Sequence, residues 1–160
     1  MNKKYVLSVY VIIILSLFLS ACGATPASTV SVDRGAQFVQ AYEQMEGKLP
    51  EMMEMPEDTV LDFYGIDPAE YSAALFRLSV DNMLADEVIL IQAKDEPSAT
   101  HIEEMLNGRL QAKAEEAESY SPDQYAIISK CSVCRDGLTL AMIVNANAEE
   151  MLTVFQQAIA

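Results

Sequence analysis

Residues 131–144, CSVCRDGLTLAMIV, decide the fold because they have the pattern of a β-hairpin. The pair Asp136-Gly137 readily adopts positive φ at both turn positions, and it lies between the extended segments Cys131–Arg135 and Leu138–Val144. Two antiparallel strands are therefore expected here. The core face of the second strand would hold every second residue, namely Leu138, Leu140, Met142 and Val144.

A first hairpin is predicted upstream. Tyr71–Val80 fits a strand in which Ala74, Phe76, Leu78 and Val80 share one face, although a helix would align Tyr71, Leu75 and Leu78. The strand is favoured because Glu87–Lys94 is rich in β-branched and aliphatic residues. The short connection Asp81–Ala85 then suits a hairpin between the two segments.

Helices are predicted around and between the hairpins. Their apolar spacing places them at Arg34–Glu46, Thr59–Gly65, Pro97–Tyr120, Pro122–Ile128 and Ala148–Ile159. Thr100 and Glu103 stand at capping-box spacing for the long helix, and Asp67–Glu70 has the pattern of another helix start. Leu49–Pro56 is bracketed by prolines, which predicts irregular or extended structure. The fold class is then α+β: an antiparallel four-stranded sheet made of two hairpins, with the long helix and the C-terminal helix packed on it.

The first 22 residues have the organisation of a secretory signal. Two lysines at positions 3 and 4 precede the uncharged stretch 6–19, which is too short for a typical transmembrane helix. Residues 19–22, LSAC, resemble the lipobox of bacterial lipoproteins. That resemblance implies cleavage between Ala21 and Cys22 and a diacylglyceryl group on the Cys22 thiol. An uncleaved N-terminal anchor is the alternative, and both interpretations place the body outside the cytoplasm.

These expectations divide the chain into a signal peptide (1–21), a lipidated flexible tether (22–32) and a single domain (33–160). Removing the signal leaves eight basic and 24 acidic side chains, so the formal charge moves from −14 to −16. Such an excess repels phosphate backbones, which excludes nucleic acid as an expected partner. The content of 51% hydrophobic residues is too high for a disordered chain. We expect attachment to the cell membrane, on its extracytoplasmic face, through the lipid on Cys22.

A family resemblance extends from about residue 49 to the C-terminus. It is carried by YGID (64–67), ADEV (85–88), AKD (93–95), Arg109, YSPDQY (120–125) and Gly137. On these segments the body resembles the Firmicute lipoproteins that contain domain of unknown function 4358. The resemblance supports a strand beginning at 85–88 and implies no catalytic residues. The chain departs from the family pattern at Cys131 and Cys134.

Cys131 and Cys134 form the constellation closest to a chemical motif. A redox dithiol needs a thiolate at a helix N-terminus, whereas these cysteines follow a helix and lie in an expected strand. Strand residues three apart are separated by roughly 10 Å and face opposite sides, beyond the span of about 7 Å that a disulfide can close. A zinc site would need a second ligand pair, and only His101 remains. Two ordinary strand residues are expected, with a thiol-redox or metal-handling protein as the alternative.

The methionines of one acidic segment offer a second metal hypothesis. Met45, Met52, Met53 and Met55 could present thioethers to Cu(I), because soft ligands select that ion. Methionine also fills gaps in irregular parts of a core, and this packing role is the one we expect.

Three acidic residues and the single histidine are further candidate site residues. Asp81, Asp86 and Glu87 cluster around the first hairpin and could hold Ca²⁺, but the alternating ligands of a dedicated loop are missing. His101 stands alone near a helix start, where an exposed position is expected. We therefore assign no catalytic residue, metal or cofactor. The sequence predicts a non-catalytic domain that binds a protein or small-molecule partner at the membrane surface.

Overall fold

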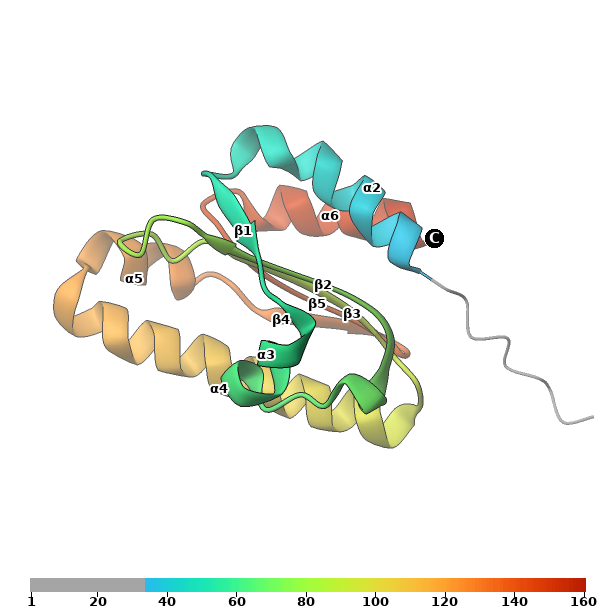
Figure 1. The fold of residues 1–160 in the computed structure, drawn as a ribbon. Helices are drawn as coiled ribbons and strands as arrows, with labels where there is room; N and C mark the ends of the chain where they lie inside the picture. Colours follow the sequence, from blue (N-terminus) through green and yellow to red (C-terminus); the bar gives the residue numbers. More distant parts are fainter. Residues whose placement is uncertain (1–33) are drawn as a thin grey trace, which may run out of the picture. The chain divides into compact units, whose positions relative to one another are not determined.

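The computed structural model describes residues 34–160 (Figure 1). The expected signal peptide (1–21), the lipidation site Cys22 and the tether (22–32) lie outside the described residues. In chain order the elements are α2 (Gly35–Met45), η2 (Glu46–Lys48), β1 (Met52–Glu54), α3 (Glu57–Tyr64), η3 (Pro68–Glu70), β2 (Tyr71–Ser79), β3 (Glu87–Ala93), α4 (Glu96–Tyr120), α5 (Pro122–Ile128), β4 (Val133–Asp136), β5 (Thr139–Val144) and α6 (Ala148–Ile159). The predicted α+β class, both hairpins, the long helix and the C-terminal helix are confirmed.

The sheet has five strands and not the predicted four. Its order is β1-β2-β3-β5-β4, and every neighbouring pair is antiparallel. The additional strand β1 is only three residues long, so it shows no alternation that a sequence pattern could reveal. Its pairing with β2 ends where the amide of Met55 donates to the carbonyl of Phe76 at 3.1 Å. Pro56 follows, and because proline has no amide hydrogen the ladder cannot continue.

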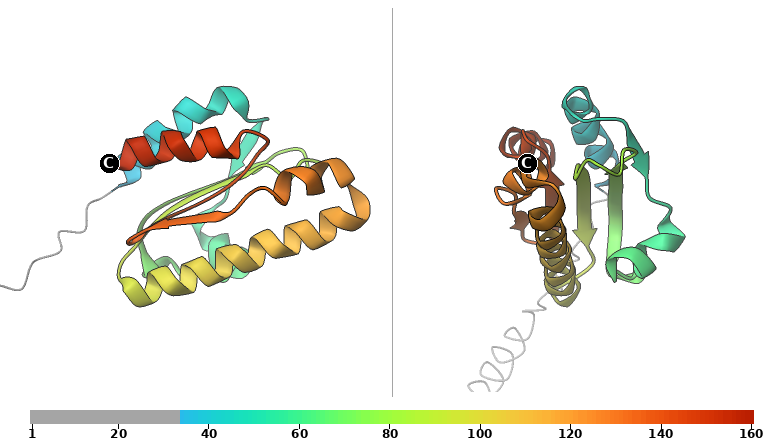
Figure 2. Two further views of the ribbon diagram at one scale, coloured as in Figure 1. Left: turned by 180° about the vertical axis from the view of Figure 1, so that it is seen from behind. Right: turned by 90° about the vertical axis from the view of Figure 1, so that its left-hand side faces the viewer.

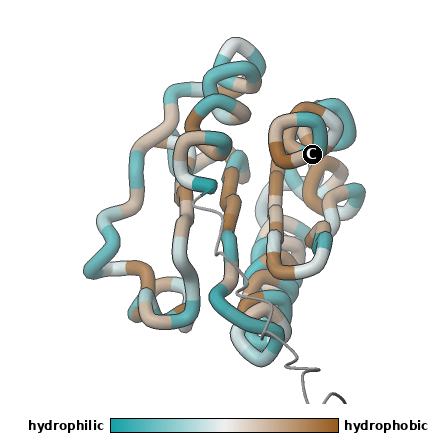
Figure 3. Tube along the Cα trace, turned by 90° about the vertical axis from the view of Figure 1, so that its right-hand side faces the viewer, coloured by the Kyte–Doolittle hydropathy of each residue, from teal (hydrophilic) through white to brown (hydrophobic). Residues whose placement is uncertain are grey.

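Helices cover both faces of the sheet, whereas the sequence predicted one layer of helices. In Figures 1 and 2, α2 and α6 lie on one side of the sheet and α3 and α4 on the other. All residues of β3 and β5 are buried, which requires a core on each side. Figure 3 shows the corresponding hydrophobic colouring along the central strands. The predicted core face of β5 is therefore real but incomplete, because Ala141 and Ile143 pack into the second core.

The two cores divide the helices between them. The first contains Ile89, Leu140 and Met142 with residues of α3, α4 and α5. The second contains Leu90 and Ile143 with residues of α2 and α6. Both cores use only residues between positions 38 and 159, so the compact unit Ser31–Ala160 carries all of its own core.

The beginning and end of the described body are joined. The rings of Phe38 in α2 and Phe155 in α6 lie 6.1 Å apart between centroids. Arg34 Nη1 donates a hydrogen bond of 2.7 Å to the carbonyl of Ile159. The two helices therefore form one unit on the sheet face that lies away from α4.

Strand β2 has the predicted faces up to Ser79, where it ends, so Val80 is exposed and not in the core as predicted; the strand also has one irregularity. Ala74, Phe76 and Leu78 face the first core as expected. The pairing with β3 shifts between Tyr71 and Ala73, so one extra residue is accommodated there. This bulge changes the parity of the strand, and Tyr71 therefore joins the first core although its spacing alone would place it on the other face.

The turn of the second hairpin differs from the prediction by one residue. Asp136 pairs with Thr139 inside the ladder, so the two loop residues are Gly137 and Leu138. Only Gly137 has a positive φ, at 57°, which is the pattern of a type II′ turn. The strand begins at Val133, and Cys131 therefore precedes it.

Two helix starts also differ from the predictions. Asp95, and not Thr100, caps α4, because its carboxylate accepts a hydrogen bond from the amide of Ser98 at 2.9 Å. The capping box of Asp67 and Glu70 is present, but it starts a single 3₁₀ turn. Strand β2 follows at once, so tertiary pairing overrides the local signal for a longer helix.

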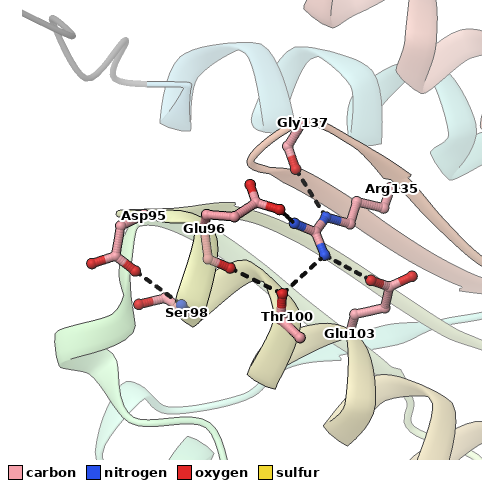
Figure 4. A network of polar contacts seen from close by, with 7 residues as sticks. All are labelled: Asp95, Glu96, Ser98, Thr100, Glu103, Arg135 and Gly137. Atoms are coloured by element: carbon pink, nitrogen blue, oxygen red, sulfur yellow. Dashed lines mark hydrogen bonds and ion pairs between the residues drawn. The ribbon is translucent and has the colours of Figure 1, made fainter.

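Arg135 of β4 joins the second hairpin to the start of α4 (Figure 4). Its guanidinium binds the carboxylates of Glu96 and Glu103 and donates to Thr100 at 3.3 Å. The Glu103 hydrogen bond is the main reason why the pKa of Arg135 is raised above its ordinary value. This network holds the N-terminal part of α4 against the second hairpin.

Candidate ligand-binding pocket

A buried carboxylate lies between β3 and α4. Glu87 opens β3, and its side chain is completely buried. Tyr64 Oη donates to Glu87 Oε1 at 2.7 Å, and Lys113 Nζ lies 2.8 Å from Oε2. Arg109 adds its Nε at 3.3 Å and its Nη2 at 3.3 Å from the same oxygen. Two cations therefore share one carboxylate, which leaves one positive charge in excess.

Local sequence explains why these groups meet. Arg109 and Lys113 are four residues apart on α4 and so project from the same helix face. Tyr64 is the last residue of α3, and Gly65 ends that helix in the left-handed conformation at φ 71°. A Cβ atom on Gly65 would lie only 3.1 Å from the sulfur of Met105 on α4. The glycine thus allows α3 to end against α4 with the Tyr64 ring directed at the carboxylate.

The environment keeps Tyr64 protonated. Burial raises the pKa of its phenol far above the ordinary value of 10.0, and the nearby Glu87 charge raises it further. Tyr64 is therefore a hydrogen-bond donor throughout the physiological pH range. Within residues 34–160 no buried side-chain nitrogen or oxygen lacks a hydrogen-bond partner. The cluster is thus a fully satisfied polar network inside the first core.

A pocket of about 440 Å³ opens beside this network. Its walls come from the end of β2, the β2–β3 loop, the second half of α4 and the start of α5, which meet at one end of the molecule in Figure 1. Arg109 and Lys113 line the pocket, whereas Glu87 and Tyr64 do not. The two cations therefore lie between the buried carboxylate and the cavity, where a ligand would meet them first.

Apolar and polar side chains share the rest of the pocket lining. Its lining includes Met83, Leu84 and Tyr120, which are 75%, 36% and 86% exposed. The loop that carries the first two is tied to α5, because the Ala85 amide donates to Gln124 Oε1 at 2.9 Å. Exposed large apolar side chains gathered at the mouth of a cavity are typical of a binding site.

The structure does not join the two cysteines. Both Cys131 and Cys134 are free and partly buried. They pack against different cores, as expected, but the prediction of two strand residues is correct only for Cys134, because Cys131 precedes β4. Burial is the main cause that raises the pKa of the Cys131 thiol, which suppresses the reactive thiolate.

The other predicted metal ligands are also dispersed. Met45 and Met52 belong to the second core, Met55 packs against the first, and Met53 is half exposed. Alternation along β1 causes this separation, and it does not favour a shared copper site. Within residues 34–160 no group of three or more His, Cys, Asp or Glu side chains is placed to hold a metal ion.

The acidic residues of the first hairpin have separate roles. Asp81 accepts a hydrogen bond from the amide of Met83 at 2.9 Å, which shapes the loop. Asp86 Oδ1 accepts from the side-chain amide of Asn145 at 2.5 Å. Glu87 is held by the cations described above. These contacts do not favour the Ca²⁺ site that the sequence analysis considered as an alternative, because the three carboxylates have different partners.

His101 is partly buried rather than fully exposed. Its Nδ1 lies 2.7 Å from Glu70 Oε1, so the 3₁₀ turn before β2 contacts the start of α4. This pair stands at the opposite end of α4 from the pocket and is a link between two segments of the fold.

Sequence reasoning missed Arg109 and Lys113 as pocket residues and Tyr64 as the partner of Glu87. Three of the segments that carry the family resemblance supply Tyr64, Glu87 and Arg109, so their convergence is the signal that was available. The spacing of two cations by four residues on a mainly acidic helix was a second signal. Neither signal identifies the facing wall, because that wall is set by packing of α4 on the sheet.

Comparison with known proteins assigns the chain to a family. The model of a domain of unknown function, DUF4358, matches residues 45–145. The chain therefore belongs to this family. The matched range contains the sheet, α3, α4, α5 and every residue of the pocket. No curated protein and no solved structure matches the chain. Within residues 34–160 no helix has the length and apolar character needed to span a membrane.

Proposed function

We propose that this protein is a lipid-anchored, extracytoplasmic binding protein without catalytic activity. The sequence of residues 1–22 supports anchoring through Cys22, because a basic segment, a short apolar segment and the LSAC lipobox follow one another. The body would then present its binding site near the outer surface of the cell membrane. Its acidic character supports a partner other than nucleic acid.

One observation carries the binding role, namely the pocket between the β2–β3 loop and α4. It has the volume expected of a small-molecule site and combines an apolar wall with two placed cations. The hydrogen bond between Ala85 and Gln124 holds the loop in place, so the pocket is already formed in the protein without a ligand. A preformed site loses less free energy to ordering when a ligand binds.

The test is a ligand screen on residues 31–160, the unit that contains both cores. Amide resonances would be recorded while a library of small anions, cations and neutral amphiphiles is added. Binding compounds should shift resonances of residues 79–86 and 120–124, and leave those of α2 and α6 in place. The proposal is wrong if no compound moves the pocket resonances.

Two matched substitutions localise the effect. Leu84→Ala removes an apolar group from the pocket wall and should weaken binding. Val39→Ala removes a similarly exposed group from α2, outside this pocket, and should not change it. Equal weakening by both substitutions would contradict binding in the pocket.

A further inference from the structure

We infer that the pocket selects a monocarboxylate with an apolar body, an inference that rests on the binding role proposed above. The ligand carboxylate would face Arg109 and Lys113 on α4. Its apolar part would lie against the apolar residues of the lining, which are Ala117 on α4 itself and Leu78, Met83, Leu84 and Ile128 on the neighbouring segments.

The two cations of α4 are only partly neutralised by the buried carboxylate. Glu87 accounts for one of the two positive charges, and its contacts use Lys113 Nζ together with Nε and Nη2 of Arg109. An ammonium group has three donors and a guanidinium has five, so both cations keep donors for a second acceptor. With Glu87 bound, these remaining donors suit one further carboxylate group.

The two cations are also largely buried. The side chains of Arg109 and Lys113 are only 25% and 14% exposed. Partial burial strengthens a charge-assisted hydrogen bond because less water competes for the donors. Arg109 is also held by aromatic rings, with its Cζ atom 4.8 Å from the ring centre of Phe63. The donors are thus fixed before a ligand arrives.

Two acidic residues also line the pocket, and neither occupies the cations. Asp86 accepts a hydrogen bond from the side-chain amide of Asn145. Glu116 is exposed on α4, where water screens its charge. A wholly anionic wall would repel a carboxylate, whereas this lining combines the two cations with apolar and neutral polar residues as well as the two acids.

The experiment compares octanoate with octanamide, which has the same chain and a neutral head group. Amide resonances of residues 31–160 report binding of each probe, as in the screen above. Octanoate should bind about tenfold more tightly, since a hydrogen bond to a charged group contributes that difference. Both probes should shift the same pocket resonances.

Three substitutions test the charge argument with effects of different sign. Lys113→Gln should reduce the preference for octanoate, whereas Glu87→Gln should increase it because both cations are then released. Glu87→Gln keeps an oxygen that can accept from Tyr64. Lys48→Gln removes a cation that pairs with Glu150, away from the pocket, and should leave the preference unchanged.

The outcomes separate the two proposals. Equal binding of octanoate and octanamide in the pocket would overturn the carboxylate inference and leave the binding role intact. Screen hits that are mainly neutral or cationic would do the same. Pocket resonances that respond to neither probe and to no library compound would overturn both.

Discussion

Arg109 contacts an aromatic ring and a carboxylate at once. Its Cζ atom lies 4.8 Å from the ring centre of Phe63, and its Nη2 lies 3.3 Å from Glu87 Oε2. Phe63 belongs to α3, Arg109 to α4 and Glu87 to β3, so one side chain connects three elements. This connection holds Arg109 in the wall of the pocket. Tyr64 and Gly65 stabilise the same region.

Tyr64→Phe should lower the free energy of unfolding by about 1.5–3 kcal/mol, because it removes a hydrogen bond to a buried charged group. Urea unfolding of residues 31–160 measures the change. Tyr120→Phe is the control, since Tyr120 is 86% exposed and should change little. Equal effects of the two substitutions would show that the buried hydroxyl contributes nothing.

Gly65→Ala should destabilise the protein by about 1–2 kcal/mol. Alanine is strained at φ 71°, and its Cβ would lie 3.1 Å from the Met105 sulfur. Gly108→Ala offers the opposite case, because Gly108 is inside α4 with nothing within 4 Å of an added Cβ. It should stabilise the protein by about 0.5–1 kcal/mol. Thermal unfolding of both variants would reveal a wrong sign at either position.

The cap of α4 should make part of the stability depend on pH. The hydrogen bond from Ser98 lowers the pKa of Asp95 below its ordinary value of 3.8. A depressed folded-state pKa gives stability that is present above 3.8 and is lost as the pH falls through the folded value. Asp95→Ala should therefore destabilise at neutral pH, and its difference from the natural protein should shrink below pH 3.8. A difference that stays constant from pH 7 to pH 2 would contradict this assignment.

The two cysteines should remain thiols in the folded body. They pack against opposite faces of the sheet, so no disulfide can join them. Alkylation after unfolding without reductant should modify both, as counted by mass spectrometry. Reduced protein serves as the reference and should give the same mass. Unreduced protein that takes up no label would indicate an intramolecular disulfide and revive the redox alternative.

The anchor is tested in cells. A labelled fatty acid should be incorporated into the full chain and be absent from the Cys22→Ala variant. Cys131→Ala is the matched control and should retain the label. A natural chain that stays unlabelled and keeps residues 1–21 by mass would rule out the lipoprotein assignment.

Sequence patterns predicted most elements because their signals are local. Asp136-Gly137 between alternating segments located one hairpin, and the aliphatic run from Val88 located the other. The edge strand β1 was not predicted, because three residues are too few to show a periodic pattern. The second helical layer was missed for a different reason, since the alternation of β5 was assigned to one face although both are buried.

The pocket depended on contacts that no local pattern encodes. As a site residue, Glu87 was considered only as a possible Ca²⁺ ligand, because Asp86 precedes it and Asp81 lies nearby in sequence. Its actual partners, Tyr64 and Lys113, come from segments more than 20 residues away in either direction. The sequence shows an acidic cluster around Glu87, whereas long-range packing brings the cations Arg109 and Lys113 to it.

The joined ends of the body have a mechanical consequence. If Cys22 is held in the membrane, any pull on the protein reaches the body through Arg34 and α2. The hydrogen bond from Arg34 to Ile159 and the contact between the tilted rings of Phe38 and Phe155 share that load with α6. Both helices lie on the sheet face away from α4, so the load enters on the face opposite Arg109 and Lys113.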